Sequence, residues 1–132
     1  MNHIKARITN IQEGENLSIV SFEVQGHLLK MMALGLSLPV GIGSEVILGA
    51  KASNIAIAKE FSGNLSISNR LHVKIEKIQK GELLCAIFFR FDTYLLESII
   101  TRDSADAMDL HVNDSIIALI KSSEISIIEV LS

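Results

Sequence analysis

The chain has 132 residues, a hydrophobic fraction of 48% and a formal net charge of −3. These totals exclude a disordered chain and oppose nucleic acid as a general partner. The single cysteine, Cys85, excludes a disulfide within the chain. The stretch after Met1 lacks the basic and apolar regions of a signal peptide, and no apolar run reaches the roughly 18 residues of a membrane span. We therefore expect a soluble, cytoplasmic protein with no membrane partner.

Five short strands are predicted in the first half of the chain. Alternation of apolar and polar residues indicates half-buried strands at 4–11 and 17–24, and the turn Gln25-Gly26 leads to a third strand at 27–33. A helical turn is predicted at Leu34–Leu38, ended by Pro39 and the glycines that follow. Two further strands are predicted at 45–50 and 54–58.

The second half repeats this plan after a linker at 59–64. Strands are predicted at 66–76, 83–91 and 94–101, followed by a short acidic helix at 102–109 and two last strands. Each half therefore has five strands with a short helical turn between the third and the fourth, which is the order of an OB-type barrel. The predicted fold is all-β, with two tandem five-stranded OB-type barrels in domains 1–60 and 65–132.

The two halves also share residues at matched positions. Gly14 and Gly81 are 67 positions apart, whereas Lys51 and Lys121 are 70 apart, so the second copy carries about three extra residues, most easily placed within Thr101–Asp109. Units of this size bury only roughly 60% of their unfolded surface and are marginally stable alone. We therefore expect the two units to pack together or to form oligomers.

One short motif occurs in both copies. Lys51-Ala52-Ser53 and Lys121-Ser122-Ser123 each follow a predicted strand and precede another. A cation, hydroxyl groups and backbone N–H groups at one corner are suited to a small anion. A lone lysine at a strand end is more often simply solvated, but the repeated position favours a shared role.

Other candidate residues give no pattern of this kind. The four histidines lack metal-ligand spacing, and the aspartates at 103, 106 and 109 are typical of a solvated helix face. No nucleophile and base form a recognisable catalytic arrangement, so the sequence provides no evidence for an enzyme. Only six aromatic residues and the negative charge also oppose single-stranded nucleic acid as a ligand of OB-type barrels.

The order of these motifs resembles the molbindins, which are built from Mop (TOBE-type) domains. The family's first strand opens Ser-Ala-Arg-Asn-x-Leu, and this chain reads Ser66-Ile67-Ser68-Asn69-Arg70-Leu71. Ile100-Thr101 matches the end of the family's third strand, and Lys51-Ala52-Ser53 matches its Lys-Ala-Ser/Thr corner. The chain departs from the family at Ser68, where the family has arginine, and at Leu34, where it has a hydroxyl. Arg70 lies on the same strand face as Ser68, and we consider it a substitute for that arginine.

The resemblance implies a cytoplasmic protein that binds molybdate or tungstate for storage, homeostasis or sensing, with no organic cofactor. It also implies a homo-oligomer, usually a trimer, with oxyanion sites between subunits. The residues it implicates in oxyanion binding are Ser66, Ser68, Asn69, Arg70, Thr101, Lys121, Ser122 and Ser123 in the second half, and Lys51, Ala52 and Ser53 in the first. The alternative is a degenerate tandem module that docks on a molybdate transporter or regulator without binding the oxyanion.

Overall fold

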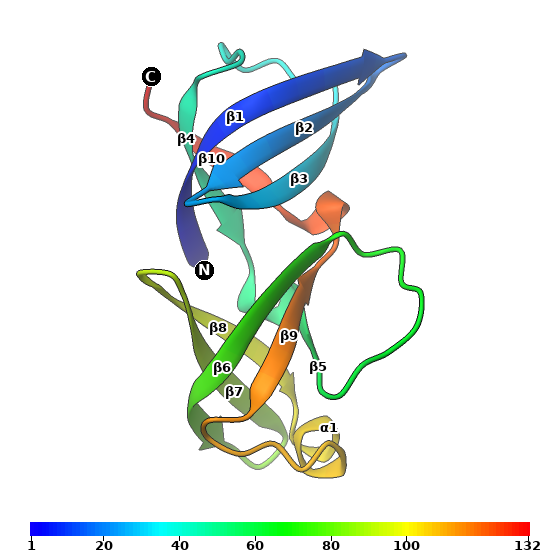
Figure 1. The fold of residues 1–132 in the computed structure, drawn as a ribbon, viewed down its shortest axis with the longest axis vertical. Coiled ribbons are helices and arrows are strands. Elements are labelled where there is room, and N and C mark those ends of the chain that lie inside the picture. The colour runs from blue at the N-terminus through cyan, green and yellow to red at the C-terminus, as the bar shows by residue number, and fades with distance from the viewer.

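A computed structural model describes all residues from Met1 to Ser132. The strands form two five-stranded curled sheets, which stack along the long axis of the molecule (Figure 1). In chain order the strands are β1 (Asn2–Gly14), β2 (Leu17–Val24), β3 (His27–Leu34), β4 (Glu45–Ala50), β5 (Ile55–Ala58), β6 (Asn69–Lys80), β7 (Leu84–Phe91), β8 (Tyr94–Thr101), β9 (Ser115–Ile120) and β10 (Ser126–Val130). The helical elements are η1 (Ala52–Asn54), α1 (Arg102–Ala107) and η2 (Ser122–Glu124). The predicted all-β fold with two OB-type barrels is confirmed.

Tight turns set the register of the hairpins. Gln25 and Gly26 both have positive φ, 48° and 88°, which matches the right-handed twist of the β2–β3 hairpin and pairs Val24 with His27. Asp92, with φ 53°, has the corresponding place between β7 and β8. Alternate residues of these strands are buried, as in β2, so one face of each hairpin covers the core.

The fifth strand of each sheet comes from the other repeat. The strand orders are β10-β4-β1-β2-β3 and β5-β9-β6-β7-β8, so β5 joins the second sheet and β10 joins the first. The sequence led us to expect five strands from each repeat within its own barrel, and this assignment of the last strands is corrected. The predicted boundaries, 1–60 and 65–132, describe the repeats in the sequence and not the membership of the sheets.

In the first sheet, the exchanged strand β10 approaches β4 closely at Gly49. A Cβ atom at this position would lie 2.8 Å from Cγ2 of Ile128, which belongs to β10. A glycine in β4 therefore allows β10 to pack beside it, and the short turns η1 and η2 direct the chain from one barrel to the other.

Two asparagine side chains connect the barrels. Asn69 at the start of β6 accepts a hydrogen bond from the backbone N–H of Lys30 and donates one to its carbonyl, both at 2.8 Å. Asn2 at the start of β1 makes the equivalent pair with Glu97, at 2.7 and 2.9 Å. Both asparagines are buried, so each amide fixes the edge of β3 or β8 against the other barrel.

Two details differ from the sequence-based predictions. No helix forms at Leu34–Leu38, because Leu34 ends β3, Gly35 has a φ of 62° and Pro39 disfavours a helical conformation at the residue before it. β6 begins at Asn69 and not at Ser66, because the preceding segment folds back toward the side chain of Arg70. The predicted helix after β8 is confirmed as α1, which lies within the segment where we placed the extra residues.

Candidate functional site

The two Lys-x-Ser motifs meet at the waist of the molecule, between the barrels. Lys51 directly precedes η1 and Lys121 directly precedes η2, and both lysines have extended backbones. Asn54 in η1 donates a 2.9 Å hydrogen bond to the carboxylate of Glu124 in η2. Because these two residues hold the same position in the two repeats, the motifs are related by an approximate twofold axis that passes between them.

A hollow of about 190 Å³ opens where the two motifs meet. Since a water molecule takes about 30 Å³ of the liquid, the hollow has room for a small ion and some of its hydration. One motif supplies Lys51 and Asn54, and the other supplies Ser123 and Glu124. The remaining lining residues are Met1, Gly49, Ala50 and Ser126. The structure thus brings together Lys51 and Ser123, two residues from different repeats.

Most predicted residues of the second half lie near Lys121. Asn69 pairs with Ile120 across β6 and β9, so Ser68 precedes that pair on one strand and Lys121 follows it on the other. Lys121, Ser123 and Ser68 are exposed, and Ser122 is half-buried. The neighbouring exposed residue Ser66 lies in the segment before β6.

Two of the predicted residues are already engaged within the chain. The amide of Asn69 bonds the backbone of Lys30, as described above. The guanidinium of Arg70 donates to the carbonyls of Ile67 and Leu65, at 2.8 and 2.7 Å. Arg70 therefore fixes the segment that carries Ser66 and Ser68 and leaves only part of its donor set for a ligand.

Thr101 lies apart from the lysine motifs, where β8 leads into α1 at the far end of the second barrel (Figure 1). Its hydroxyl accepts from the backbone N–H of Ser104 at 3.1 Å and donates to the Ser104 hydroxyl at 2.9 Å, so it caps the helix. One ion therefore cannot contact Thr101 and Lys121 of the same chain.

Some residues of the hollow were not predicted from the sequence motifs. Asn54, Glu124 and Ser126 line it, yet none was among the predicted site residues. Asn54 and Glu124 follow the lysines at equal distances in both repeats, so extending the repeated motif by one residue would have found them.

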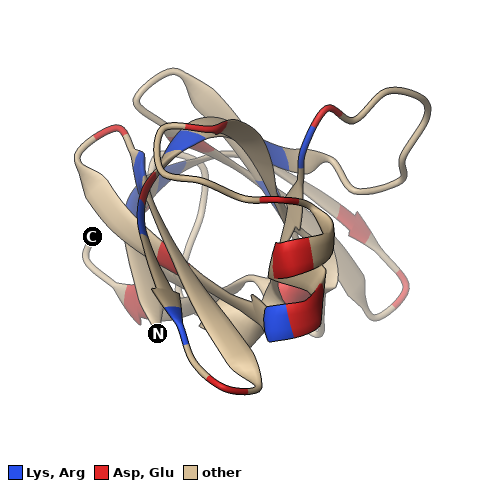
Figure 2. Ribbon diagram, turned by 90° about the horizontal axis from the view of Figure 1, so that it is seen from below, with Lys and Arg blue, Asp and Glu red and all other residues tan.

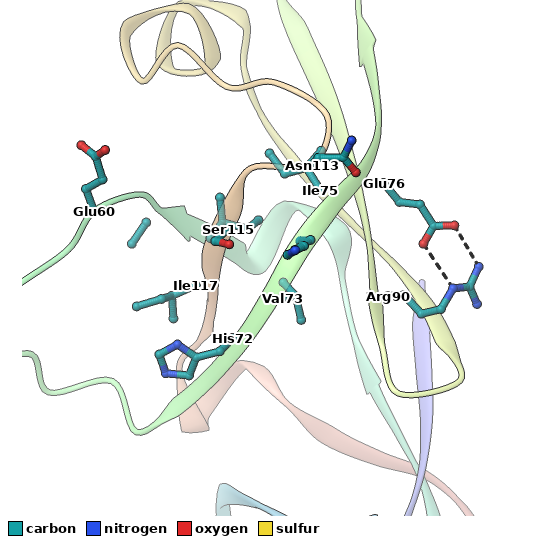
Figure 3. A pocket seen from close by; sticks show the side chains of 12 residues that line it. Glu60, His72, Val73, Ile75, Glu76, Arg90, Asn113, Ser115 and Ile117 are labelled. Atoms are coloured by element: carbon teal, nitrogen blue, oxygen red, sulfur yellow. Dashed lines mark hydrogen bonds and ion pairs between the residues drawn. The ribbon is translucent and has the colours of Figure 1, made fainter.

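A larger hollow of about 660 Å³ lies on the second barrel and contains none of the predicted residues (Figure 3). His72 and Ile117 line one part of it, and at the other side the Arg90 guanidinium and the Glu76 carboxylate form a paired contact with two 3.2 Å bonds. Since Arg90 is neutralised by Glu76, this hollow offers less net charge to an anion than its basic residues suggest.

Charged residues gather on α1 at the end of the second barrel (Figure 2). Hydrogen bonding from Lys80, with Arg102 nearby, holds the pKa of the Asp106 carboxyl below its ordinary value. Burial raises the pKa of the Cys85 thiol, which lies in the core.

No group of three or more His, Cys, Asp or Glu side chains is placed to hold a metal ion. None of the helical elements has the length and apolar character needed to cross a bilayer.

Comparison with known proteins adds to this geometry. The family model of the TOBE domain matches residues 65–127. The second repeat is therefore similar to the TOBE domain. Over the whole fold, the chain is similar to a crystal structure of the cytoplasmic molybdate-binding protein ModG with molybdate bound, with a TM-score of 0.89 and 23% identity. The alignment covers 95% of this chain and 93% of that one. No curated protein in the comparison matches the chain. The resemblance to tandem Mop proteins is thus confirmed.

Proposed function

We propose that this protein reversibly binds a tetrahedral oxyanion, molybdate or tungstate, in the cytoplasm, and performs no chemistry on it. The observation that carries the proposal is the meeting of the two Lys-x-Ser motifs at the waist, where Lys51 and Ser123 line one small hollow. The TOBE match and the fold shared with a protein described as molybdate-binding support the choice of ligand. Storage, homeostasis or sensing of the oxyanion follows from binding without catalysis.

Each motif would supply a cation, hydroxyl groups and backbone N–H groups. A dianion that leaves water needs compensating hydrogen bonds, and each bond to a charged group contributes about 1.5–3 kcal/mol. Lys51 and Lys121 provide positive charge, Ser53, Ser122 and Ser123 provide hydroxyl groups, and Ala52 provides only its backbone N–H. In the hollow, the amide of Asn54 holds the Glu124 carboxylate, which leaves Lys51, Ser123 and Ser126 as the side-chain donors available to a ligand.

We further propose that the protein acts as a homo-oligomer, with trimers as the expected form. Thr101 is engaged at the far end of the second barrel, so a hydroxyl from this position reaches Lys121 only if a second copy supplies it. Sites of this kind would lie between copies. A molybdate transporter or regulator is the expected downstream partner.

Thermal unfolding with 1 mM molybdate, tungstate or sulfate tests the proposal. A ligand at about 100 times its Kd adds roughly 2.7 kcal/mol, so molybdate or tungstate should raise the midpoint by several degrees and sulfate should not. Lys51→Ala and Lys121→Ala should each reduce the shift. Lys74→Ala is the matched control, because Lys74 is exposed on β6 and belongs to neither motif. Unchanged midpoints with both metal oxyanions would contradict the proposal and favour a protein-docking module.

A gain of function provides a second test. Ser68→Arg places the family's arginine beside Lys121 and adds charge-assisted donors to the second motif. One such bond corresponds to about a tenfold decrease in Kd. Titration calorimetry of the variant should show this tighter binding of molybdate, and a weaker affinity would show that position 68 does not face the ligand.

A further inference from the structure

The outer surface of β3 is apolar and has no strand packed over it in this chain. Leu29 and Met31 are buried, so the residues between and beside them point outward. These outward residues, which we name the β3 face, are Leu28, Lys30, Met32 and Leu34. Leu28 is 59% exposed and Leu34 is 85% exposed, which is unusual for large apolar side chains on a regular strand.

The equivalent surface of β8 has the same arrangement. Leu96 and Ser98 are buried, and the outward residues, which we name the β8 face, are Leu95, Glu97, Ile99 and Thr101. Each lies 67 positions after its counterpart on the β3 face. Leu95 is 52% exposed, and Leu84 on the adjacent β7 is 56% exposed, so apolar surface extends across this hairpin as well.

The charge at the centre of the two faces is reversed. Lys30 lies between Leu28 and Met32, whereas Glu97 lies between Leu95 and Ile99. Both charged residues are half-buried, and neither belongs to any ion pair within the chain. A partly desolvated charge flanked by apolar groups gains most from an opposite charge that arrives with its own apolar surroundings.

We propose that the β3 face of one copy packs on the β8 face of a second copy, with Lys30 of one opposite Glu97 of the other. Two β3 faces packed together would bring lysine against lysine at the centre, and two β8 faces would bring glutamate against glutamate. Because each copy carries one face of each kind, the contact is heterologous and repeats from copy to copy until a ring closes. The partner is therefore this chain itself.

This contact deepens the homo-oligomer of the proposed function, on which it partly rests. η2 lies against β3, and η1 lies against β8. A contact between the two faces therefore brings the second lysine motif of one copy near the first lysine motif of the next. Since the contact itself involves no oxyanion, it is tested in the absence of molybdate, and its failure is distinct from a failure of ligand binding.

Charge reversal tests the proposal by light scattering coupled to size-exclusion chromatography of the full chain. The wild type should be oligomeric, and Lys30→Glu or Glu97→Lys should each weaken self-association by roughly tenfold or more, because each places like charges opposite each other. The double variant Lys30→Glu/Glu97→Lys restores opposite charges and should regain the wild-type mass. In an equimolar mixture of the two single variants, opposite charges meet only where unlike variants touch. The mixture should therefore contain pairs of unlike chains and reach a higher mass than either variant alone, without fully regaining a ring of three copies. A higher mass also shows that both variants are folded.

Two control variants carry matched charge changes elsewhere. Lys74→Glu and Glu129→Lys alter exposed residues on β6 and β10 that form no ion pair, and both should keep the wild-type mass. A monomeric wild type, single variants of unchanged mass, or single variants that stay dissociated both when mixed and when combined in one chain would each overturn the proposal.

Discussion

Phe22 in the first repeat and Phe89 in the second hold the same position, and both are fully buried. Leu34 and Thr101 also correspond, yet one is an exposed apolar side chain and the other caps α1. The repeats therefore share the residues that fill the barrels and differ in those at the strand ends and turns. This difference indicates that packing constrains the cores alike, while the surfaces of the repeats have acquired separate roles.

The largest expected effects come from the shared core. Phe22→Ala and Phe89→Ala each remove a large buried ring and should lower the free energy of unfolding by about 3–5 kcal/mol. Because β5 and β10 are exchanged between the sheets, neither barrel is complete without the other, and each variant should still melt in one transition. Calorimetry would contradict this coupling if either variant showed two separate transitions, one unchanged from the wild type.

Replacing Asn2 and Asn69 tests whether their hydrogen bonds between the two barrels contribute equally to stability. Asn69→Ala removes both side-chain bonds to the Lys30 backbone, and Asn2→Ala removes the matching pair at Glu97. Each variant should lower the free energy of unfolding by about 2–3 kcal/mol, since two backbone groups lose their partners. Asn2 also donates to the carbonyl of Ala50 at 3.2 Å, so its loss should be the larger of the two. Urea unfolding measures both, and a larger loss for Asn69→Ala would contradict this ranking.

The helix cap is a feature that the repeats do not share. Thr101→Ala removes the hydroxyl that accepts from the N–H of Ser104 and should cost about 1 kcal/mol. The matched change, Leu34→Ala, affects an exposed side chain that precedes no helix, and we expect a smaller change in the stability of the isolated chain. Urea unfolding of dilute, monomeric protein tests this, and a larger loss for Leu34→Ala would show that the first repeat depends on that leucine for its fold.

Alternation and turn residues were sufficient to predict ten strands and α1, because half-buried strands and their turns leave local signals. The exchange of β5 and β10 left no such signal. A strand such as Ile55–Ala58 has the same pattern whichever sheet it joins. For β10, the close approach of Ile128 to Gly49 joins residues that are far apart in the sequence and leaves no local pattern. The role of Asn69 was equally hidden, because its contact with Lys30 spans two repeats. The lysine motifs were found because the chain repeats them.

The smallest effect concerns one turn that both repeats share. Asp114 accepts from the backbone N–H of His111 at 2.8 Å, and in the first repeat Ser44 accepts from Gly41 at 3.0 Å. The backbone bond from His111, followed by the contact with Lys59, lowers the pKa of Asp114 from its ordinary value of 3.8. A lowered pKa in the folded state stabilises the protein at pH values above the ordinary one, and this contribution is lost as the pH falls through the lowered pKa.

Only the second turn therefore responds to acid. Asp114→Ser copies the first repeat. Between about pH 5 and pH 3, the range in which carboxylates titrate, the melting midpoint of this variant should fall less than that of the wild type. Ser44→Ala, which removes a group that does not titrate, should lower the midpoint equally at both pH values. An Asp114→Ser slope identical to that of the wild type would place the acid sensitivity elsewhere, with Asp106 beside Lys80 as the next carboxylate to replace.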